Sequence, residues 1–157
     1  MGISWPTLIG NLIIGVIIAV VSSYVTVTFA LKRFYSEKRW ERKEKAYTRI
    51  IEALHYIWNH ADHNYKAAML NKDIPDEIDL RLMDEMNKSV AELRKQIDIG
   101  TFVVSEEAVK VLGILMKELD RSTKNKLWTE HLTTKMEATE KCLAEMRTIA
   151  RKDLKLP

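Results

Sequence analysis

The chain has 157 residues, with 25 Lys or Arg, 22 Asp or Glu and a formal net charge of +3. This length leaves room for one compact domain once a membrane segment is subtracted, so a large multidomain protein is excluded. The single cysteine, Cys142, excludes an internal disulfide and fits a reducing compartment, and its place on an apolar helical face predicts a buried thiol.

The N-terminal segment carries no charge over residues 1–31, and residues 8–31 form an almost continuous apolar run. As a helix this run spans roughly 36 Å, which exceeds the hydrocarbon core of a bilayer at about 30 Å. A secretory signal peptide would have a basic N-terminal region and a shorter apolar stretch, whereas the first charge here follows the run. Residues 1–31 are therefore predicted to form an uncleaved transmembrane helix in a lipid bilayer.

A basic linker follows over residues 32–49, with eight Lys or Arg and three Glu. Because no Lys or Arg precedes the apolar run, the positive-inside rule predicts an outside N-terminus and a cytoplasmic C-terminal part. Trp5 and Tyr35 are expected near the two membrane interfaces. Anionic headgroups are the expected partner of the linker, and RNA or DNA binding by the linker is the alternative. The partners expected for the chain as a whole do not include DNA.

The first helix of the soluble part is predicted from a stripe of apolar or small residues at alternating spacings of four and three. The stripe consists of Tyr47, Ile51, Leu54, Trp58, Ala61, Tyr65 and Ala68, with Trp40 one heptad upstream. No Gly or Pro lies between Leu31 and Asn71, so the membrane helix is expected to continue into this one.

Three more helices are predicted over the rest of residues 50–157. Pro75 followed by two acids predicts the second helix start, and Gly100 its end. Residues 101–104 are expected to form a buried connection, and Ser105 caps the third helix. Residues 120–126 are expected to form the next loop, and the fourth helix is expected to end near Leu154.

Each of these three helices has an apolar stripe that is expected to face the core. The stripe of the second helix consists of Met83, Met86, Val90, Leu93 and Ile97. Those of the third and fourth helices consist of Val109, Leu112, Leu115, Met116 and Leu119, and of Trp128, Leu132, Met136, Leu143, Met146 and Ile149.

The predicted fold is therefore all-α, with one transmembrane helix followed by a cytosolic four-helix bundle. The sequence has no Gly-rich phosphate loop, no H-E-x-x-H pattern and no Cys-based metal motif. Neither an enzyme nor a cofactor is expected. His60 and His63 are three apart on one predicted helix face, where they border the core, contact an organic ligand or hold a metal with Asp62; no metal is assigned.

The loop before the fourth helix holds the strongest candidate binding residues. Five side chains there combine positive charge, an amide and a flat aromatic: Arg121, Lys124, Asn125, Lys126 and Trp128. Charge pairs with phosphate and an aromatic ring stacks on a base, so this set suits a nucleotide-like ligand. The alternative is a solvated loop followed by a core tryptophan.

The apolar segment also carries small residues spaced by four, at Gly15, Ala19 and Ser23 and again at Ser22, Thr26 and Ala30. Small residues at this spacing let membrane helices approach closely. The chain is therefore expected to associate with copies of itself.

This organisation resembles the membrane effectors of type III CRISPR antiviral defence, which join a short transmembrane part to a small cytosolic helical domain. The resemblance rests on one anchor, the linker KRFYSEKRWERKEKAYTRIIEAL (residues 32–54), a compact helical domain and the tail EMRTIARKDLKLP (residues 145–157). It implies an inner-membrane effector, assembled as a homotetramer, that senses cyclic tetra-adenylate and disrupts the membrane through its anchors. The implied ligand contacts are the five loop residues, with His60 and His63 second.

A second interpretation needs no small molecule. The stripe from Trp40 to Ala68 also suits a membrane-tethered scaffold that docks a cytoplasmic protein partner.

Overall fold

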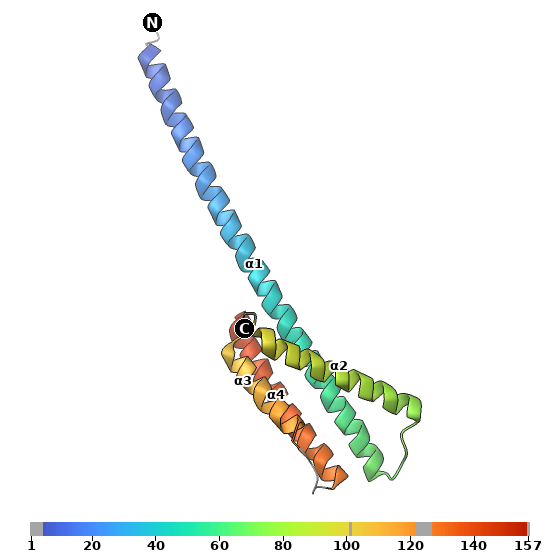
Figure 1. Ribbon diagram of the computed structural model, residues 1–157. Coiled ribbons are helices and arrows are strands. Elements are labelled where there is room, and N and C mark those ends of the chain that lie inside the picture. Colours follow the sequence, from blue (N-terminus) through green and yellow to red (C-terminus); the bar gives the residue numbers. More distant parts are fainter. Residues whose placement is uncertain (1–4, 101, 122–126, 157) are drawn as a thin grey trace. The chain divides into compact units, whose positions relative to one another are not determined.

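The structure is a computed structural model that describes residues 5–100, 102–121 and 127–156. These residues form four helices and no strand, so the predicted all-α fold is confirmed: α1 (Trp5–Met69), α2 (Asp76–Gly100), α3 (Glu106–Leu119) and α4 (Trp128–Leu154) (Figure 1). The chain divides into two compact units, Met1–Glu41 and Arg42–Pro157. The second unit is called the helical domain below, and the division falls inside the predicted linker.

Helix α1 is continuous over 65 residues, as the absence of Gly and Pro between Leu31 and Asn71 predicts. It ends where Asn71 adopts a left-handed φ of 48°, a conformation that Asn tolerates better than most residues.

The apolar part of α1 belongs to the first unit. The large apolar side chains of residues 14–31 are between 44% and 73% exposed. An 18-residue window in α1 has a mean hydropathy of 2.2, which is sufficient in length and composition for a membrane span. The Thr26 and Thr28 hydroxyls each donate to a backbone carbonyl one turn earlier, at 2.8 Å. These bonds satisfy both hydroxyls within the helix, which lowers the cost of placing them in lipid.

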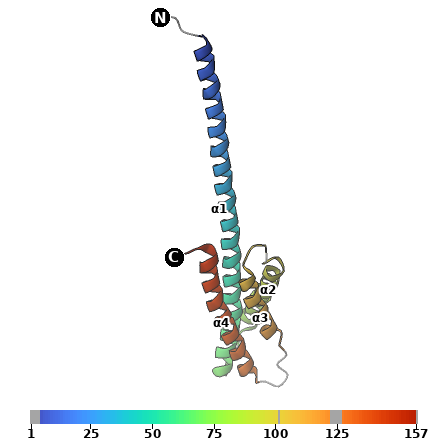
Figure 2. The same cartoon turned by 90° about the vertical axis from the view of Figure 1, so that its left-hand side faces the viewer.

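The helices of the helical domain alternate in direction along the chain, and α3 and α4 lie side by side (Figure 1). The α2–α3 turn and the C-terminal end of α4 lie at the same end of the domain (Figure 2). Ser105 caps α3 as predicted, because its side chain accepts a hydrogen bond from the Ala108 N–H. α2 also begins and ends next to the predicted residues, Pro75 and Gly100.

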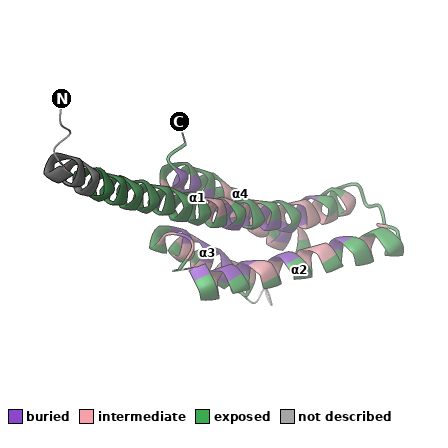
Figure 3. Cartoon of the chain, turned by 90° about the horizontal axis from the view of Figure 1, so that it is seen from above, coloured by how far each residue is buried: buried purple, intermediate pink, exposed green. Residues whose placement is uncertain are grey.

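The core lies where the four helices face one another, and the buried residues form stripes on their inner sides (Figure 3). Its largest fully buried side chains are Tyr47, Ile50, Leu54, Leu93, Leu112, Leu132, Met146 and Thr139. Cys142 is 4% exposed, so the prediction of a buried thiol is confirmed.

Several predicted inward positions are wrong, and Trp40 and Ala68, at the two ends of the stripe predicted on the first helix, are both exposed. Trp128 is 56% exposed, because it is the first residue of α4 and its ring packs on His131 one turn before the first buried residue, Leu132. Met83 is exposed because its neighbour Leu82 takes the inward position on α2. In the predicted buried connection, Phe102 is 90% exposed.

One partly buried hydrogen-bond cluster joins α1 and α4 to the start of α3. The hydroxyl of Tyr47 in α1 donates a short hydrogen bond to the Asp153 carboxylate in α4 and lies 3.4 Å from the Ser105 hydroxyl. Burial, together with the bond to Asp153, raises the pKa of Tyr47 to about 12. Burial alone would raise the pKa of Asp153, but the bonds from Tyr47 and Ser105 and the charge of Lys43 lower it below its usual value. The cluster therefore favours a charged Asp153 and a neutral Tyr47.

We expect Tyr47→Phe to lower the free energy of unfolding by about 2 kcal/mol, because it removes a hydrogen bond to a charged acceptor. Chemical denaturation of the detergent-solubilised chain, followed by circular dichroism, measures this loss. Tyr56→Phe is the matched control, since Tyr56 is 45% exposed. Equal stability losses for the two variants would contradict the assigned role of the cluster.

Candidate functional site

The structure describes the two ends of the predicted binding loop. Lys124, Asn125 and Lys126 lie outside the described residues, so their placement stays a prediction. Arg121 and Trp128 are described, and both are exposed.

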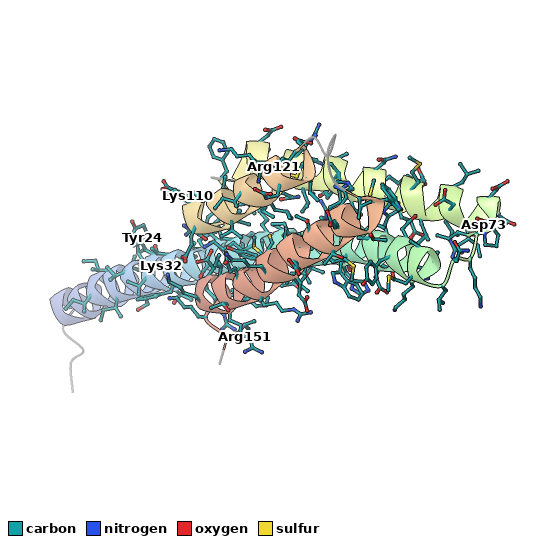
Figure 4. The ribbon with its side chains drawn as sticks, turned by 90° about the horizontal axis from the view of Figure 1, so that it is seen from below. Tyr24, Lys32, Asp73, Lys110, Arg121 and Arg151 are labelled. Atoms are coloured by element: carbon teal, nitrogen blue, oxygen red, sulfur yellow. The ribbon has the colours of Figure 1, made fainter. Side chains whose placement is uncertain are left out.

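Arg121 follows the last turn of α3 and projects from that end of the helix (Figure 4). Its guanidinium lies 3.5 Å from the Glu118 carboxylate, and both side chains are partly or largely exposed. Exposed pairs of this kind contribute little to stability, so Arg121 can exchange Glu118 for another anion at low cost. The neighbouring Asp120 accepts a hydrogen bond of 2.9 Å from Arg94, which ties the end of α3 to α2.

Trp128 presents an accessible aromatic ring at the start of α4. Its centroid lies 5.8 Å from that of His131, with the two ring planes tilted by 37°. Because more than half of the side chain is exposed, one face of this pair can stack on a planar ligand.

A groove between α1 and α4 begins directly after Trp128. It has a volume of about 420 Å³ and is open to solvent. It is called the α1–α4 groove below. Its lining residues are Tyr65, Met69, Thr129, Glu130, Thr133 and Thr134. The Thr133 hydroxyl donates to the Thr129 carbonyl at 3.0 Å, which leaves its oxygen able to accept a hydrogen bond from a ligand.

The chemistry of the α1–α4 groove is that of hydroxyls, one carboxylate and one aromatic ring. No Lys or Arg lines it among the described residues. A ligand held by these groups alone would be a neutral hydrogen-bonding molecule or an apolar segment of a partner. Phosphate binding would require cations from residues 121–126 or from another copy of the chain.

A smaller hollow of about 200 Å³ lies further along the same two helices. It is lined by His55 and Trp58 from α1 and by Thr139, Glu140 and Leu143 from α4. The His55 and Trp58 rings are stacked, with centroids 6.5 Å apart and planes 17° apart. Sequence reasoning missed this pair, although an aromatic three residues after a histidine places both rings on one helix face.

His60 and His63 differ in their surroundings. His60 is half-buried; its Nε2 lies 3.4 Å from the Asn64 amide nitrogen, and that amide donates to the His60 carbonyl at 2.9 Å. His63 is exposed, with Nδ1 3.3 Å from the Asn59 carbonyl oxygen. Neither residue lines the α1–α4 groove.

Burial lowers the pKa of His60, and the positive charge of Lys135 lowers it further, although Asp79 acts in the opposite direction. A neutral ring fits the geometry, because an unprotonated Nε2 can accept the Asn64 amide. The described residues contain no group of three or more His, Cys, Asp or Glu that could hold a metal ion.

Cys142 offers no reactive thiol. Burial raises its pKa to about 12, and the nearby Glu145 adds to the effect. A thiol in this state is a weak nucleophile at neutral pH, since the thiolate is the reactive form.

No protein-family model, curated protein or solved structure matches this chain.

The lowered pKa of His60 predicts that the stability of the folded chain depends on pH. Its folded pKa lies below the unfolded value of 6.5, so its contribution is complete above pH 6.5 and is lost as the pH falls below that value. We expect wild type to lose stability between pH 7.5 and pH 5.5, and His60→Gln to lose less. Denaturation midpoints at the two pH values measure this difference.

The matched control is His63→Gln, which removes an exposed ring from the same helix and is expected to behave like wild type. If His60→Gln lost as much stability as wild type between pH 7.5 and pH 5.5, a group other than His60 would be responsible for the pH dependence.

Proposed function

We propose that this chain is a membrane-anchored binding protein whose helical domain acts by binding rather than by catalysis. The observation that carries the proposal is the continuity of α1, which joins an exposed apolar segment to the core of a compact helical domain. The open grooves beside α4 support binding, because they offer aromatic, hydroxyl and carboxylate groups to a ligand or partner.

The proposed topology places the helical domain in the cytoplasm. Every Lys and Arg lies after the apolar segment, and eight of them fall within residues 32–49. This distribution favours a cytoplasmic C-terminal side and anionic lipid beside the linker.

The more specific form of the proposal is an inner-membrane antiphage effector that senses a cyclic oligoadenylate. The resemblance to type III CRISPR effectors supports it, and so does the Trp128 ring beside the α1–α4 groove, which suits base stacking. In this mechanism, phosphates are bound by Arg121, Lys124 and Lys126. Because the groove itself has no lining cation among the described residues, a ring-shaped ligand is held between copies in a homo-oligomer, with a tetramer matching cyclic tetra-adenylate.

In the same mechanism α1 links ligand binding to the bilayer. A helix without Gly or Pro over residues 32–70 transmits a rotation or shift of the domain to the apolar segment with little bending. Rearranged anchors then disrupt the membrane.

The competing function is a membrane-tethered scaffold that docks a cytoplasmic protein. The observation that favours it is that the α1–α4 groove and the smaller hollow further along the same helices are both accessible from solvent. Tyr65 lines the first and Trp58 the second. Open grooves between helices that combine aromatic rings with hydroxyl and carboxylate groups also suit an added amphipathic helix from a partner.

Thermal melting of the detergent-solubilised full chain with cyclic oligoadenylates of several ring sizes tests the sensor. We expect one ring size to raise the melting midpoint, because at 100 times its dissociation constant a ligand adds about 2.7 kcal/mol to the stability of the folded state. Trp128→Ala is expected to reduce this shift.

Phe102→Ala is the matched control, since it removes an exposed aromatic from the other end of the domain and should leave the shift unchanged. A well-folded chain that responds to no ring size would exclude the sensor form and leave the scaffold.

A further inference from the structure

One end of the helical domain carries three exposed apolar side chains, which are called the apolar tip below. Phe102, in the α2–α3 turn, is 90% exposed, the highest value among the large apolar side chains of the described residues. Ile99, in the last turn of α2, is 41% exposed, and Leu156, just after α4, is 48% exposed. Single exposed apolar residues are common on soluble domains, whereas several at one end point to a contact.

The Tyr47 cluster places the apolar tip at the end of the domain where the chain enters. Ser105 directly follows the α2–α3 turn, Asp153 lies in the last turn of α4, and both contact the Tyr47 hydroxyl. Figure 2 shows the α2–α3 turn and the C-terminal end of α4 at the same end of the domain. Because the domain begins at Arg42, this end is also the one joined to the apolar segment.

The α2–α3 turn keeps Phe102 exposed through fixed contacts. The Val103 and Val104 N–H groups donate to the Gly100 carbonyl at 2.9 and 2.7 Å, and Val104 is buried. A Cβ atom added to Gly100 would lie 2.7 Å from the Val109 side chain, so the turn approaches α3 as closely as only a glycine allows. Since the turn is tied to the core on both sides, the exposure of Phe102 is built into the fold.

The apolar tip is within reach of a bilayer that holds the anchor. Only residues 32–41 separate the last apolar residue, Leu31, from the start of the domain, which corresponds to roughly 15 Å of helix. The apolar run of roughly 36 Å is longer than a hydrocarbon core of about 30 Å, and an anchor of excess length tilts in the bilayer. Tilt brings the adjoining end of the domain closer to the headgroups.

The charges at this end of the domain nearly cancel. Residues 42–45 and 151–156 carry six Lys or Arg and two acids, while residues 98–107 carry three acids and no Lys or Arg. One of these acids, Glu107, lies 3.2 Å from Lys152 and is partly neutralised within the domain. A net charge of +1 gives little attraction to anionic headgroups, so burial of the apolar tip has to supply a contact with lipid.

We propose that this end of the helical domain rests on the bilayer that holds the anchor, with Phe102 inserted among the lipid headgroups and Ile99 and Leu156 beside it. Apolar side chains gain free energy when they are buried at the boundary between headgroups and acyl chains. The inference rests on the membrane anchor of the proposed function, but it needs neither a cyclic oligoadenylate nor a protein partner.

Fluorescence quenching from the lipid side tests the contact, with the full chain in phosphatidylcholine vesicles. A bimane label on Asp98→Cys reports on the apolar tip without removing any of its side chains, because Asp98 is exposed and lies four residues before Phe102. Nitroxide groups attached to some of the lipids, near the start of the acyl chains, quench only labels close to the bilayer surface. The native Cys142 thiol is buried and stays unlabelled.

The matched label is placed on Asp73→Cys, which removes the same acid before α2 begins, at the opposite end of that helix (Figure 4). We expect the label at position 98 to be quenched several-fold more strongly than the label at position 73.

Phe102→Asp in the chain labelled at position 98 is expected to remove most of this difference, since a charged side chain enters the interface only at high cost. Leu127→Asp is the matched control, because it introduces the same charge at an exposed apolar position just before α4 and should leave the quenching unchanged. Both positions are exposed, so both variants are expected to keep the circular dichroism spectrum of wild type.

Flotation of the vesicles separates the outcomes. A chain that does not float with the vesicles lacks the proposed anchor, which overturns the proposed function and this inference together. A chain that floats but shows equal quenching at positions 98 and 73 overturns this inference alone. The same holds if Phe102→Asp leaves the quenching unchanged.

Discussion

The contacts of the Tyr47 hydroxyl with Asp153 and with Ser105 join α1 to α4 and to the start of α3, at the end of the domain where α1 enters. A tyrosine that is 1% exposed needs a partner for its hydroxyl, and only the convergence of α1, α3 and α4 supplies one. Ser105 contributes to the same cluster while capping α3, so one small side chain serves both the start of a helix and the packing between helices. The cluster therefore holds the start of α3 and the C-terminal end of α4 beside α1.

Helix α1 has to meet two different surroundings along its length. Over residues 14–31 its apolar side chains are exposed on all sides, which suits lipid. Over residues 46–61 its apolar side chains are buried along one face, which suits a protein core with water on the other side. The change occurs without a break in the helix, so the surroundings differ while the backbone hydrogen bonding remains the same.

Much of this fold can be read from local chemistry. Pro75, Gly100 and Ser105 mark helix ends because each has a backbone or side-chain preference that acts within a few residues. The periodic stripes indicate the inward faces to within one residue, as the exchange of Met83 for Leu82 illustrates. Periodicity does not reveal which end of a stripe a neighbouring helix covers, and for this reason the prediction of a buried Trp128 is wrong.

The candidate site is less predictable, because it depends on contacts between distant segments. The α1–α4 groove joins Tyr65 to Thr129 and Thr133, and no spacing rule connects residues so far apart in the chain. His60 and His63 look equivalent in the sequence, yet only His60 lies among groups that depress its pKa, including Lys135 on another helix.

The sequence separations within the Tyr47 cluster affect the order of events during synthesis. Ser105 follows Tyr47 by 58 residues and Asp153 follows it by 106, so the ribosome must translate most of the chain before the cluster can close. The apolar segment leaves the ribosome much earlier, while the domain is still unfinished. The inner face of α1 therefore stays open to chaperones or to neighbouring nascent chains during that interval.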